Sequence, residues 1–296
     1  YKIRIDIMNT TYIKRVFLAC TFLLVASISL ESYAQKKILN IYHTHDNHSR
    51  IEPIDPQSSD RNAGKAGYVR RATILEELRK EDSTLLLFDC GDFSQGTPYY
   101  NFYRGEVEVK LMNAIQYDAV TIGNHEFDFG LENMAKLFKM ANFPIVCANY
   151  DFTGTVVEGL VQPYTILYRD GLKIGVFGLS PKMDGLVQAS NCEGVGYLDP
   201  IATADVIAAK LKNDEKCDVV ICLSHLGLRP SPLNRESDQV LVKETSNIDV
   251  VLGGHSHTFM SEPEFVANKE GRKIPITQMG KNGVFIGKIS ITLEAE

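Results

Sequence analysis

The side chains best suited to chemistry in this 296-residue sequence are its histidines. Each stands at or just beyond the end of an apolar segment that is typical of a β-strand, and several have an aspartate or asparagine beside them. One such histidine alone is commonly structural, but a whole set gathered at strand ends with carboxylates indicates a metal site. The seven histidines are His43, His45, His48, His125, His225, His255 and His257.

Five of the predicted strand ends carry groups that can bind a metal ion. Side chains converge at strand ends in α/β sheets. Seven donors are too many for one tetrahedral zinc ion, and they suit two divalent ions that share a bridging carboxylate. Because the donors are oxygens and imidazoles without a thiolate, zinc, manganese, iron, cobalt and magnesium are all compatible. The predicted metal ligands are Asp46, His48, Asp92, Asn124, His225, His255 and His257.

Two pairs of these ligands are separated by a single residue. Asp46 and His48 follow the first predicted strand, and His255 and His257 follow the dipeptide Gly253-Gly254. On extended backbone the side chains of residues i and i+2 point to the same face. We therefore expect both pairs to lie on extended segments, with the side chains of Asp46 and His48 facing a common cation.

Apolar segments alternate with helix-like segments along most of the chain, which is typical of βαβ units. Asp170-Gly171 predicts a hairpin turn in the middle, and a glycine-rich turn near the end predicts a closing antiparallel hairpin of segments 273–278 and 284–293. The sequence therefore predicts an α/β fold with mixed sheets. Strands are expected at 37–44, 84–88, 119–122, 145–148, 164–168, 173–179, 218–223 and 249–252, and helices at 67–80, 106–116, 131–141, 201–213 and 237–245.

The first 34 residues have the pattern of a secretory signal peptide. With Met8 as the start, two basic residues precede an apolar run over 16–28, and small residues end at Ala34. The run is shorter than the ~20 residues that a spanning helix needs, so cleavage near Ala34 is favoured over a membrane anchor. We expect 1–34 to be removed, 35–296 to form one domain without a transmembrane span, and the product to be periplasmic or secreted.

The net charge argues against one class of function, the binding of nucleic acid along a basic surface. The formal net charge is −6, and removal of the first 34 residues takes away four cations and two anions, which leaves −8. An acidic chain without basic clusters is poorly suited to wrapping nucleic acid.

Five cysteines follow residue 34, none with C-x-x-C spacing. Buried, inert thiols are therefore expected, with a disulfide that includes Cys192 as the alternative.

The order and spacing of the site residues resemble a known family, the calcineurin-like metallophosphoesterases. Within it, the segments 92–97 and 124–130 are similar to the exported bacterial 5′-nucleotidase branch. The resemblance implies a four-layer α-β-β-α sandwich, with two mixed sheets between helices and a dimetal site at the strand ends. The motifs that carry it are Asp46-x-His48, Gly91-Asp92, Gly123-Asn124-His125-Glu126, His225 and Gly254-His255-x-His257.

The resemblance also implies how the ligands are divided between the two metals. Asp92 would bridge both ions. The cofactors that the resemblance implies are these two divalent cations. One metal would be held by Asp46, His48 and His257, and the other by Asn124, His225 and His255.

Two further residues have roles beyond the metals in this resemblance. His125 would face the phosphoryl group as a catalytic residue, with Asp128 orienting it. A carboxylate three residues past a histidine in a turn can accept its ring N–H and favour the imidazolium, which agrees with that role. The neighbouring Glu126 is expected to accept backbone N–H groups instead.

The activity that the resemblance implies is dimetal-dependent hydrolysis of phosphate monoesters, with removal of the 5′-phosphate from nucleotides. A phosphodiesterase or nucleotide-sugar pyrophosphatase with the same metals is the first alternative, and a metal-stabilised binding subunit is the second. Members of that branch usually continue into a C-terminal domain that binds the base, whereas this sequence stops at Glu296. A separate partner chain is one candidate source of that domain, and no substrate-binding residue is assigned.

Overall fold

The computed structural model describes residues 2–5, 36–232 and 235–294. Its first β-sheet has six strands, which are, in order across the sheet, β1 (Lys2–Ile5), β14 (Gly287–Glu294), β2 (Lys37–Thr44), β3 (Leu86–Asp89), β4 (Ala119–Thr121) and β5 (Ile145–Val146). From β2 to β5 neighbouring strands are parallel, whereas β14 runs antiparallel to both β2 and β1. The sheet is therefore mixed, with its parallel half at the β5 edge.

The second sheet also has six strands. In order across the sheet they are β12 (Glu264–Ala267), β13 (Lys273–Thr277), β11 (Val250–Leu252), β10 (Val219–Ser224), β8 (Leu172–Leu179) and β7 (Tyr164–Arg169). The four inner strands are parallel and the two edge strands are antiparallel. A separate two-stranded ribbon joins β6 (Tyr150–Asp151) to β9 (Gly196–Tyr197).

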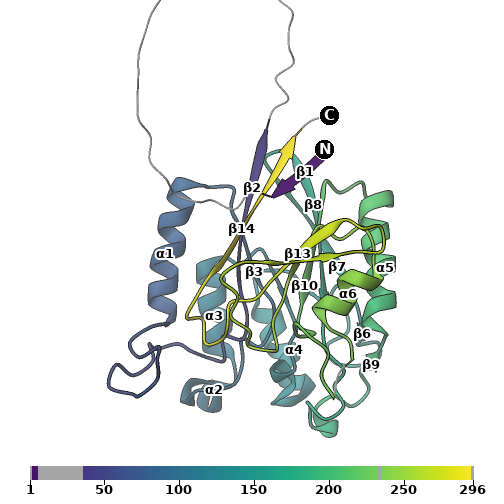
Figure 1. The fold of residues 1–296 in the computed structure, drawn as a ribbon. Coiled ribbons are helices and arrows are strands. Elements are labelled where there is room, and N and C mark those ends of the chain that lie inside the picture. Colours follow the sequence, from purple (N-terminus) through teal and green to yellow (C-terminus); the bar gives the residue numbers. More distant parts are fainter. Residues whose placement is uncertain (1, 6–35, 233–234, 295–296) are drawn as a thin grey trace, which may run out of the picture.

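Helices cover the outer faces of the sheets, with α1 and α3 on one side and α5 and α6 on the other (Figure 1). Local sequence sets their ends: Asp199 accepts the N–H groups of Ile201 and Ala202 at the start of α5, which suits an N-cap. The helices are α1 (Tyr68–Glu81), α2 (Pro98–Tyr103), α3 (Glu106–Ile115), α4 (Gly130–Met140), α5 (Pro200–Ala209) and α6 (Asp238–Glu244), with 3₁₀-helices at His125–Phe127 and Ala189–Asn191 and a π-helix at Lys210–Asp214.

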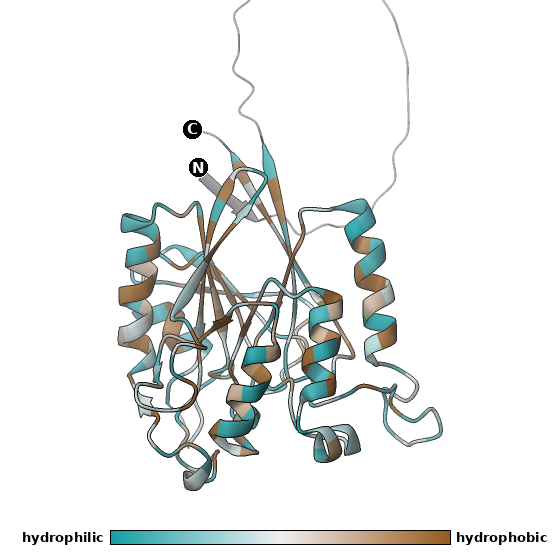
Figure 2. Cartoon of the chain, turned by 180° about the vertical axis from the view of Figure 1, so that it is seen from behind, coloured by the Kyte–Doolittle hydropathy of each residue, from teal (hydrophilic) through white to brown (hydrophobic). Residues whose placement is uncertain are grey.

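Three apolar clusters separate the four layers. Ile41 and Phe88 of the first sheet meet Ile221 of the second in the cluster between the sheets. The opposite face of the first sheet packs on α1, α3 and α4, and that of the second packs on α5 and α6. The strands at the centre are accordingly the most apolar part of the fold (Figure 2). The four-layer sandwich predicted from the sequence is confirmed.

The predicted closing hairpin is wrong. Segment 273–277 is β13, which lies between β12 and β11 in the second sheet, whereas β14 lies between β1 and β2 in the first. The glycine-rich turn at 280–283 therefore crosses from one sheet to the other. The antiparallel partner of β13 is β12, a strand that the sequence analysis missed together with α2. The segments of β13 and β14 both have the two-residue period of a strand, but that period does not specify which strand each one pairs with.

Most of the expected signal peptide lies outside the described residues, since only 2–5 of the first 35 are described. Those four residues form β1. No helix in the described ranges has the length and apolar character that a membrane-spanning helix needs. The five cysteines after residue 34 are all unpaired, and Cys192 is the one that is not buried. The disulfide alternative is therefore absent from the described part of the chain.

Candidate metal centre

The parallel strands of both sheets end at one edge of the sandwich, and all seven predicted ligands follow such ends. Within each sheet, parallel strands present their carboxyl ends at a common edge, where a ligand site forms. The first sheet supplies four of them after β2, β3 and β4, and the second supplies three after β10 and β11. The first group is Asp46, His48, Asp92 and Asn124, and the second is His225, His255 and His257.

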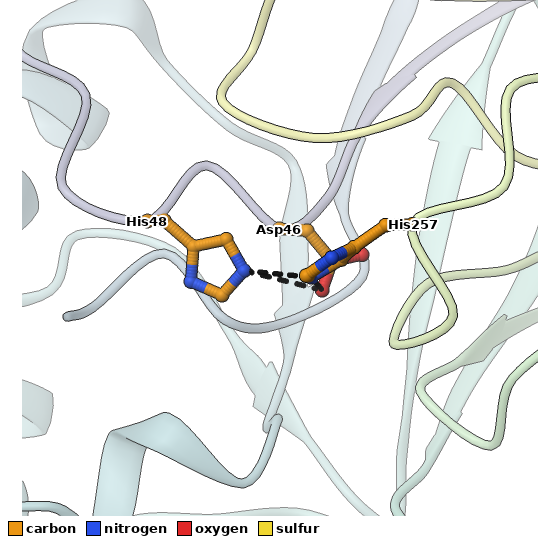
Figure 3. Close-up of side chains that lie close together, drawn as sticks. All are labelled: Asp46, His48 and His257. Carbon is orange, nitrogen blue, oxygen red and sulfur yellow. Dashed lines mark hydrogen bonds and ion pairs between the residues drawn. The ribbon is translucent and has the colours of Figure 1, made fainter. Parts of the chain in front are cut away.

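Donor atoms from the two sheets lie within a few ångströms of each other. His257 Nε2 is 2.8 Å from His48 Nε2 and 3.3 Å from Asp46 Oδ1 (Figure 3). Across the sheets, His225 Nε2 is 3.0 Å from Asp92 Oδ2. The cluster contains three groups of three residues, and within each group the donor atoms lie within 4.8 Å of one another. Neighbouring groups share a residue. They are Asp46, His48 and His257; His48, Asp92 and His125; and Asp92, His225 and His255.

Two buried oxygens in this cluster show that the residues fit bound cations. Asn124 Oδ1 has no hydrogen-bond partner although its residue is only 6% exposed, and the fully buried Asp46 Oδ1 faces only the imidazole nitrogens of His257, His48 and His225, at 3.3 to 3.9 Å. A buried acceptor without a donor costs free energy unless another positive centre meets it. Oxygen and imidazole donors without thiolate are the set expected for the divalent ions named above.

The carboxylates of the cluster are held in their ionised form. Burial alone would raise the pKa of Asp92, but the charge and hydrogen bond of His225 lower it to about 2. Burial likewise opposes ionisation of Asp46, and hydrogen bonds from His257 and His45 keep its pKa well below its ordinary value. Two anionic carboxylates among imidazoles give the cluster negative charge that favours the binding of divalent cations.

The expectation of extended backbone at the paired ligands is wrong. Asp46 and His48 have φ values of 47° and 46°, and His255 and His257 have 69° and 52°, so all four lie in the left-handed region. Asp92 does as well, at 56°. Such values are uncommon for residues other than glycine and persist where the surrounding structure imposes them. The two pairs converge through tight turns beyond the strands.

Close approach of the first-sheet loops depends on glycine at position 123. A Cβ on Gly123 would lie 2.1 Å from Asp92 Oδ1, and a Cβ on Gly91, whose φ is 89°, would lie 2.6 Å from the backbone nitrogen of Gly123. Neither distance is tolerated by real side chains. The glycines beside Asp92 and Asn124 therefore allow the β3 and β4 loops to touch.

His125 and Asp128 form an ion pair beside the predicted ligands. His125 Nδ1 lies 3.0 Å from Asp128 Oδ2, and the His125 ring meets His48 edge-on at a centroid distance of 5.5 Å. Burial opposes the charged form, but the bond to Asp128 and the charge of Asp92 raise the pKa of His125 to about 9. The backbone N–H of His125 donates to Asp92 Oδ1 at 2.9 Å. His125 is therefore a half-buried cation beside the predicted ligands His48 and Asp92.

Glu126 has the backbone-binding role expected from the sequence. Its Oε2 accepts the N–H groups of Gly123 at 2.6 Å and Asp92 at 2.9 Å, and its Oε1 accepts that of Ser94 at 3.1 Å. These bonds tie the β3 loop to the β4 loop. Glu126 is 1% exposed, and both of its carboxylate oxygens are occupied by these backbone groups.

The sequence analysis missed the residues that hold the ligand loops. Gln278, fully buried after β13, donates from Nε2 to Gly254 O at 3.0 Å, and its Oε1 accepts Ser256 Oγ at 2.9 Å and Thr258 N at 3.3 Å. Asp238 accepts from the same Nε2 at 3.0 Å. Gln278 thereby spans the turn that carries His255 and His257, and no sequence pattern marks it.

Besides His125, two of the seven histidines lie outside the predicted ligand set. His45 Nε2 accepts the N–H of Met279 at 2.6 Å, so its Nδ1 carries the proton that reaches Asp46 Oδ2 at 2.5 Å. His45 therefore orients a predicted ligand. His43 lies inside β2, opposite Gly287, and burial together with His45 lowers its pKa to about 3.

Known proteins are similar to this chain in sequence and in structure. Snake venom 5′-nucleotidase of Crotalus adamanteus is 32% identical over 93% of this chain and 47% of its own length. The 5′-nucleotidase precursor of Thermus thermophilus superposes with a TM-score of 0.78 at 29% identity, over 86% of this chain and 51% of that one. The chain thus spans about half the length of these two relatives.

A shorter solved structure matches along most of its length. The calcineurin-like phosphoesterase YfkN of Bacillus subtilis superposes with a TM-score of 0.73 at 30% identity, over 88% of this chain and 87% of that one. The sequence profile of the calcineurin-like phosphoesterases matches residues 39–259, which include every predicted metal ligand. A chain with this profile across most of its length, and with the ligand cluster at its strand ends, belongs to the calcineurin-like phosphoesterase family.

Proposed function

We propose that this protein hydrolyses phosphate monoesters and that nucleoside 5′-monophosphates are its substrates. Membership of the phosphoesterase family and the similarity to 5′-nucleotidases support this activity. The observation that carries it is the chain of three overlapping donor groups, because Asp92 and His48 are each shared by two of them. Shared ligands are the arrangement that places two ions close enough to act on one phosphoryl group.

The proposed centre holds two divalent ions. Asp92 would bind both, while Asp46, His48 and His257 would hold one and Asn124, His225 and His255 would hold the other. When bound, the ions supply an activated water and neutralise charge on the phosphoryl group. The chain contributes the fixed positions of the ligands, which the turns beyond β2, β3 and β11 set before substrate arrives.

His125 is the proposed catalytic residue that the metals do not need. Its imidazolium faces the phosphoryl oxygens and stabilises the negative charge that develops there. Asp128 Oδ2, 3.0 Å from Nδ1, orients the ring and keeps it protonated. One donor group contains His125 with His48 and Asp92, so its imidazole lies at the edge of the proposed centre.

Residues 1–34 are proposed to be a signal peptide and 35–296 the catalytic domain. The basic residues before the apolar run and the small residues up to Ala34 support export, and the protein then acts in the periplasm or outside the cell. Mass spectrometry of the exported product tests this division, because the mature chain is expected to begin at Gln35.

A substrate panel tests the proposed activity. Purified protein, stripped with a chelator and reloaded with zinc, manganese, cobalt, iron or magnesium, is assayed on nucleoside monophosphates, sugar phosphates, a cyclic nucleotide, a nucleotide sugar and bis-p-nitrophenyl phosphate. We expect the highest kcat/KM on a monoester and none without metal. Faster turnover of a diester or pyrophosphate would favour the phosphodiesterase alternative. If the wild-type protein hydrolyses none of these esters and Asp92→Ala lowers only the thermal stability, the result would favour a metal-stabilised binding subunit.

A further inference from the structure

Arg71 is a buried cation within α1 that the proposed reaction does not use. Its residue is 2% exposed, and its Nε, Nη1 and Nη2 atoms have no hydrogen-bond partner in the described ranges. The guanidinium lies over the ring of Tyr68, with Cζ 4.4 Å from the ring centroid. This cation–π contact offsets only part of the free-energy cost of burying a full charge. A negatively charged group nearby is therefore expected.

The buried carboxyl that this charge influences is Asp89, at the end of β3. Its Oδ2 accepts Thr44 Oγ1 and Asn47 Nδ2, both at 2.6 Å, and its Oδ1 accepts the N–H of Gly91 at 3.0 Å. Burial raises the pKa of Asp89 to about 7, and the bond from Thr44 and the charge of Arg71 oppose that rise. An ionised carboxyl only accepts hydrogen bonds, and it accepts them more strongly than a neutral one. The three donors therefore match the ionised form of Asp89, which the charge of Arg71 favours.

Asn47 connects Asp89 to two of the predicted metal ligands. It stands between Asp46 and His48 in the turn after β2. With its Nδ2 bound to Asp89, its side chain fixes the backbone between two residues whose φ values are 47° and 46°. Left-handed backbone is unfavourable for such residues unless the surrounding structure supports it. The bond from Asn47 to Asp89 therefore helps to keep Asp46 and His48 at the proposed centre.

Gly283 packs against both Arg71 and Asn47. A Cβ at this position would collide with Arg71 Nη2 and would lie 2.7 Å from Asn47 Oδ1, so the guanidinium and the amide face the same point of the chain. The preceding residue, Asn282, donates its N–H to the carbonyl oxygen of Asp46 at 2.7 Å. This segment therefore contacts Arg71 and also holds the ligand turn.

We propose that Arg71 is a positioning residue for the metal centre, whose buried charge keeps Asp89 an ionised acceptor. Asp89 in turn holds Asn47, and with it the ligand turn after β2. The inference rests on the proposed dimetal centre and gives a role in it to α1, which contributes no predicted metal ligand. Because Arg71 acts through Asp89, its removal should weaken one ion only and should matter little once Asp89 has lost its charge.

Zinc titration with and without the Asp89 charge tests the proposal. Chelator-stripped protein is titrated calorimetrically for the wild type, Arg71→Met, Arg71→Lys, Asp89→Asn and the double variant Arg71→Met/Asp89→Asn. Arg71→Met removes the charge at similar side-chain length and should weaken one of the two ions by about 10-fold. Arg71→Lys restores the charge and should recover part of that affinity. In the Asp89→Asn background, Arg71→Met should cost less than about twofold, because effects within one network are not additive.

Arg70→Met is the matched control for the loss of a cation from α1. Arg70 is the neighbouring residue, but it is exposed and its Nη1 donates to the carbonyl oxygen of Gly64. This variant should leave both zinc affinities unchanged. Circular dichroism of metal-free protein establishes which variants fold. If Arg71→Met does not fold, Arg71→Gln, which keeps a donor without the charge, is titrated with the same expectation, and failure of both to fold would show that the charge serves folding and would overturn the proposal.

The titrations separate failure of the inference from failure of the proposed function. Unchanged zinc affinity in Arg71→Met, equal weakening of both ions, or the same loss with and without the Asp89 charge would overturn the role of Arg71. Wild-type protein that binds fewer than two zinc ions would refute the dimetal centre itself. Wild-type protein that binds two zinc ions but hydrolyses no ester would refute only the proposed function, and the titrations would still decide the role of Arg71.

Discussion

The two sheets hold their ligand turns with the same kind of device, a buried carboxyl that binds one hydroxyl and one side-chain amide. In the first sheet, Asp89 Oδ2 accepts Thr44 Oγ1 and Asn47 Nδ2, both at 2.6 Å. Burial raises the pKa of Asp89 to about 7. Asn47 stands between the predicted ligands of the β2 turn, so the carboxyl fixes that turn from beneath.

The second sheet repeats this arrangement with residues from a more distant segment. Asp238 accepts Ser224 Oγ at 2.5 Å and Gln278 Nε2 at 3.0 Å, and burial raises its pKa to about 7 as well. Unlike Asn47, Gln278 does not belong to the turn that it holds, since it lies 24 residues beyond Gly254. The first turn is therefore held by its own residues, and the second depends on where β13 enters the sheet.

The largest effect is expected where the two halves meet, at Asp92. Its carboxylate comes from the first sheet and lies 3.0 Å from His225 Nε2 of the second. Asp92→Asn removes the anion shared by both proposed ions, so both should be lost and kcat/KM should fall by about 10³-fold or more. Metal content by plasma mass spectrometry and steady-state kinetics check this.

His125→Asn is the control for that variant, because it changes a residue of the same loops without removing a proposed ligand. It should keep both ions and lose about 10²- to 10³-fold in kcat. If the two variants lose metal equally, His125 is itself a ligand and the proposed division of roles is wrong.

Removing the side-chain amides of Asn47 and Gln278 one at a time should affect metal binding differently, because Asn47 belongs to the turn that it holds and Gln278 does not. Asn47→Ala loosens only Asp46 and His48, so one of the two ions should bind about 10- to 100-fold more weakly. Gln278→Ala loosens the turn of His255 and His257, which the proposal assigns to different ions, so both affinities should fall. Calorimetric titration of metal-free protein distinguishes one weakened site from two. Identical titrations for the two variants would contradict the comparison.

The smallest effect concerns the buried carboxyl of the second sheet. The pKa of Asp238 rises from 3.8 to about 7 on folding, so the folded state binds its proton more tightly. The free energy of unfolding should therefore fall as pH rises from about 4 to 7, by at most about 1.4 kcal/mol per pH unit from this group.

Asp238→Asn removes that titration and retains a hydrogen-bonding side chain. Urea unfolding of metal-free protein at several pH values should show a shallower fall for the variant than for the wild type. Asp89 has the same sign of shift but is present in both proteins, so its effect cancels. Parallel profiles would show that Asp238 titrates normally in the folded protein.

The sequence by itself determined which polar residue types meet at the sheet edge and most of the elements that carry them. The strand at 37–44 coincides with β2, and the other predicted strands before the tail were placed within two residues of their observed starts. Apolar runs report burial directly, because strands covered on both faces must be apolar throughout. Polar side chains that follow such runs must then lie at the sheet edge, which is why the ligand set could be named before the fold.

Only the tertiary structure decided how those side chains converge. The left-handed turns at Asp46 and His48 oppose the local preference of non-glycine residues, and they are held because both N–H groups bond to carbonyls of the β3 loop, at 2.9 and 3.0 Å. The placement of β13 and β14 in different sheets and the contact of Gln278 with the β11 turn likewise depend on segments that are far apart in the chain. A local pattern records the period and burial of a segment, but the partner of that segment is fixed by packing of the whole domain.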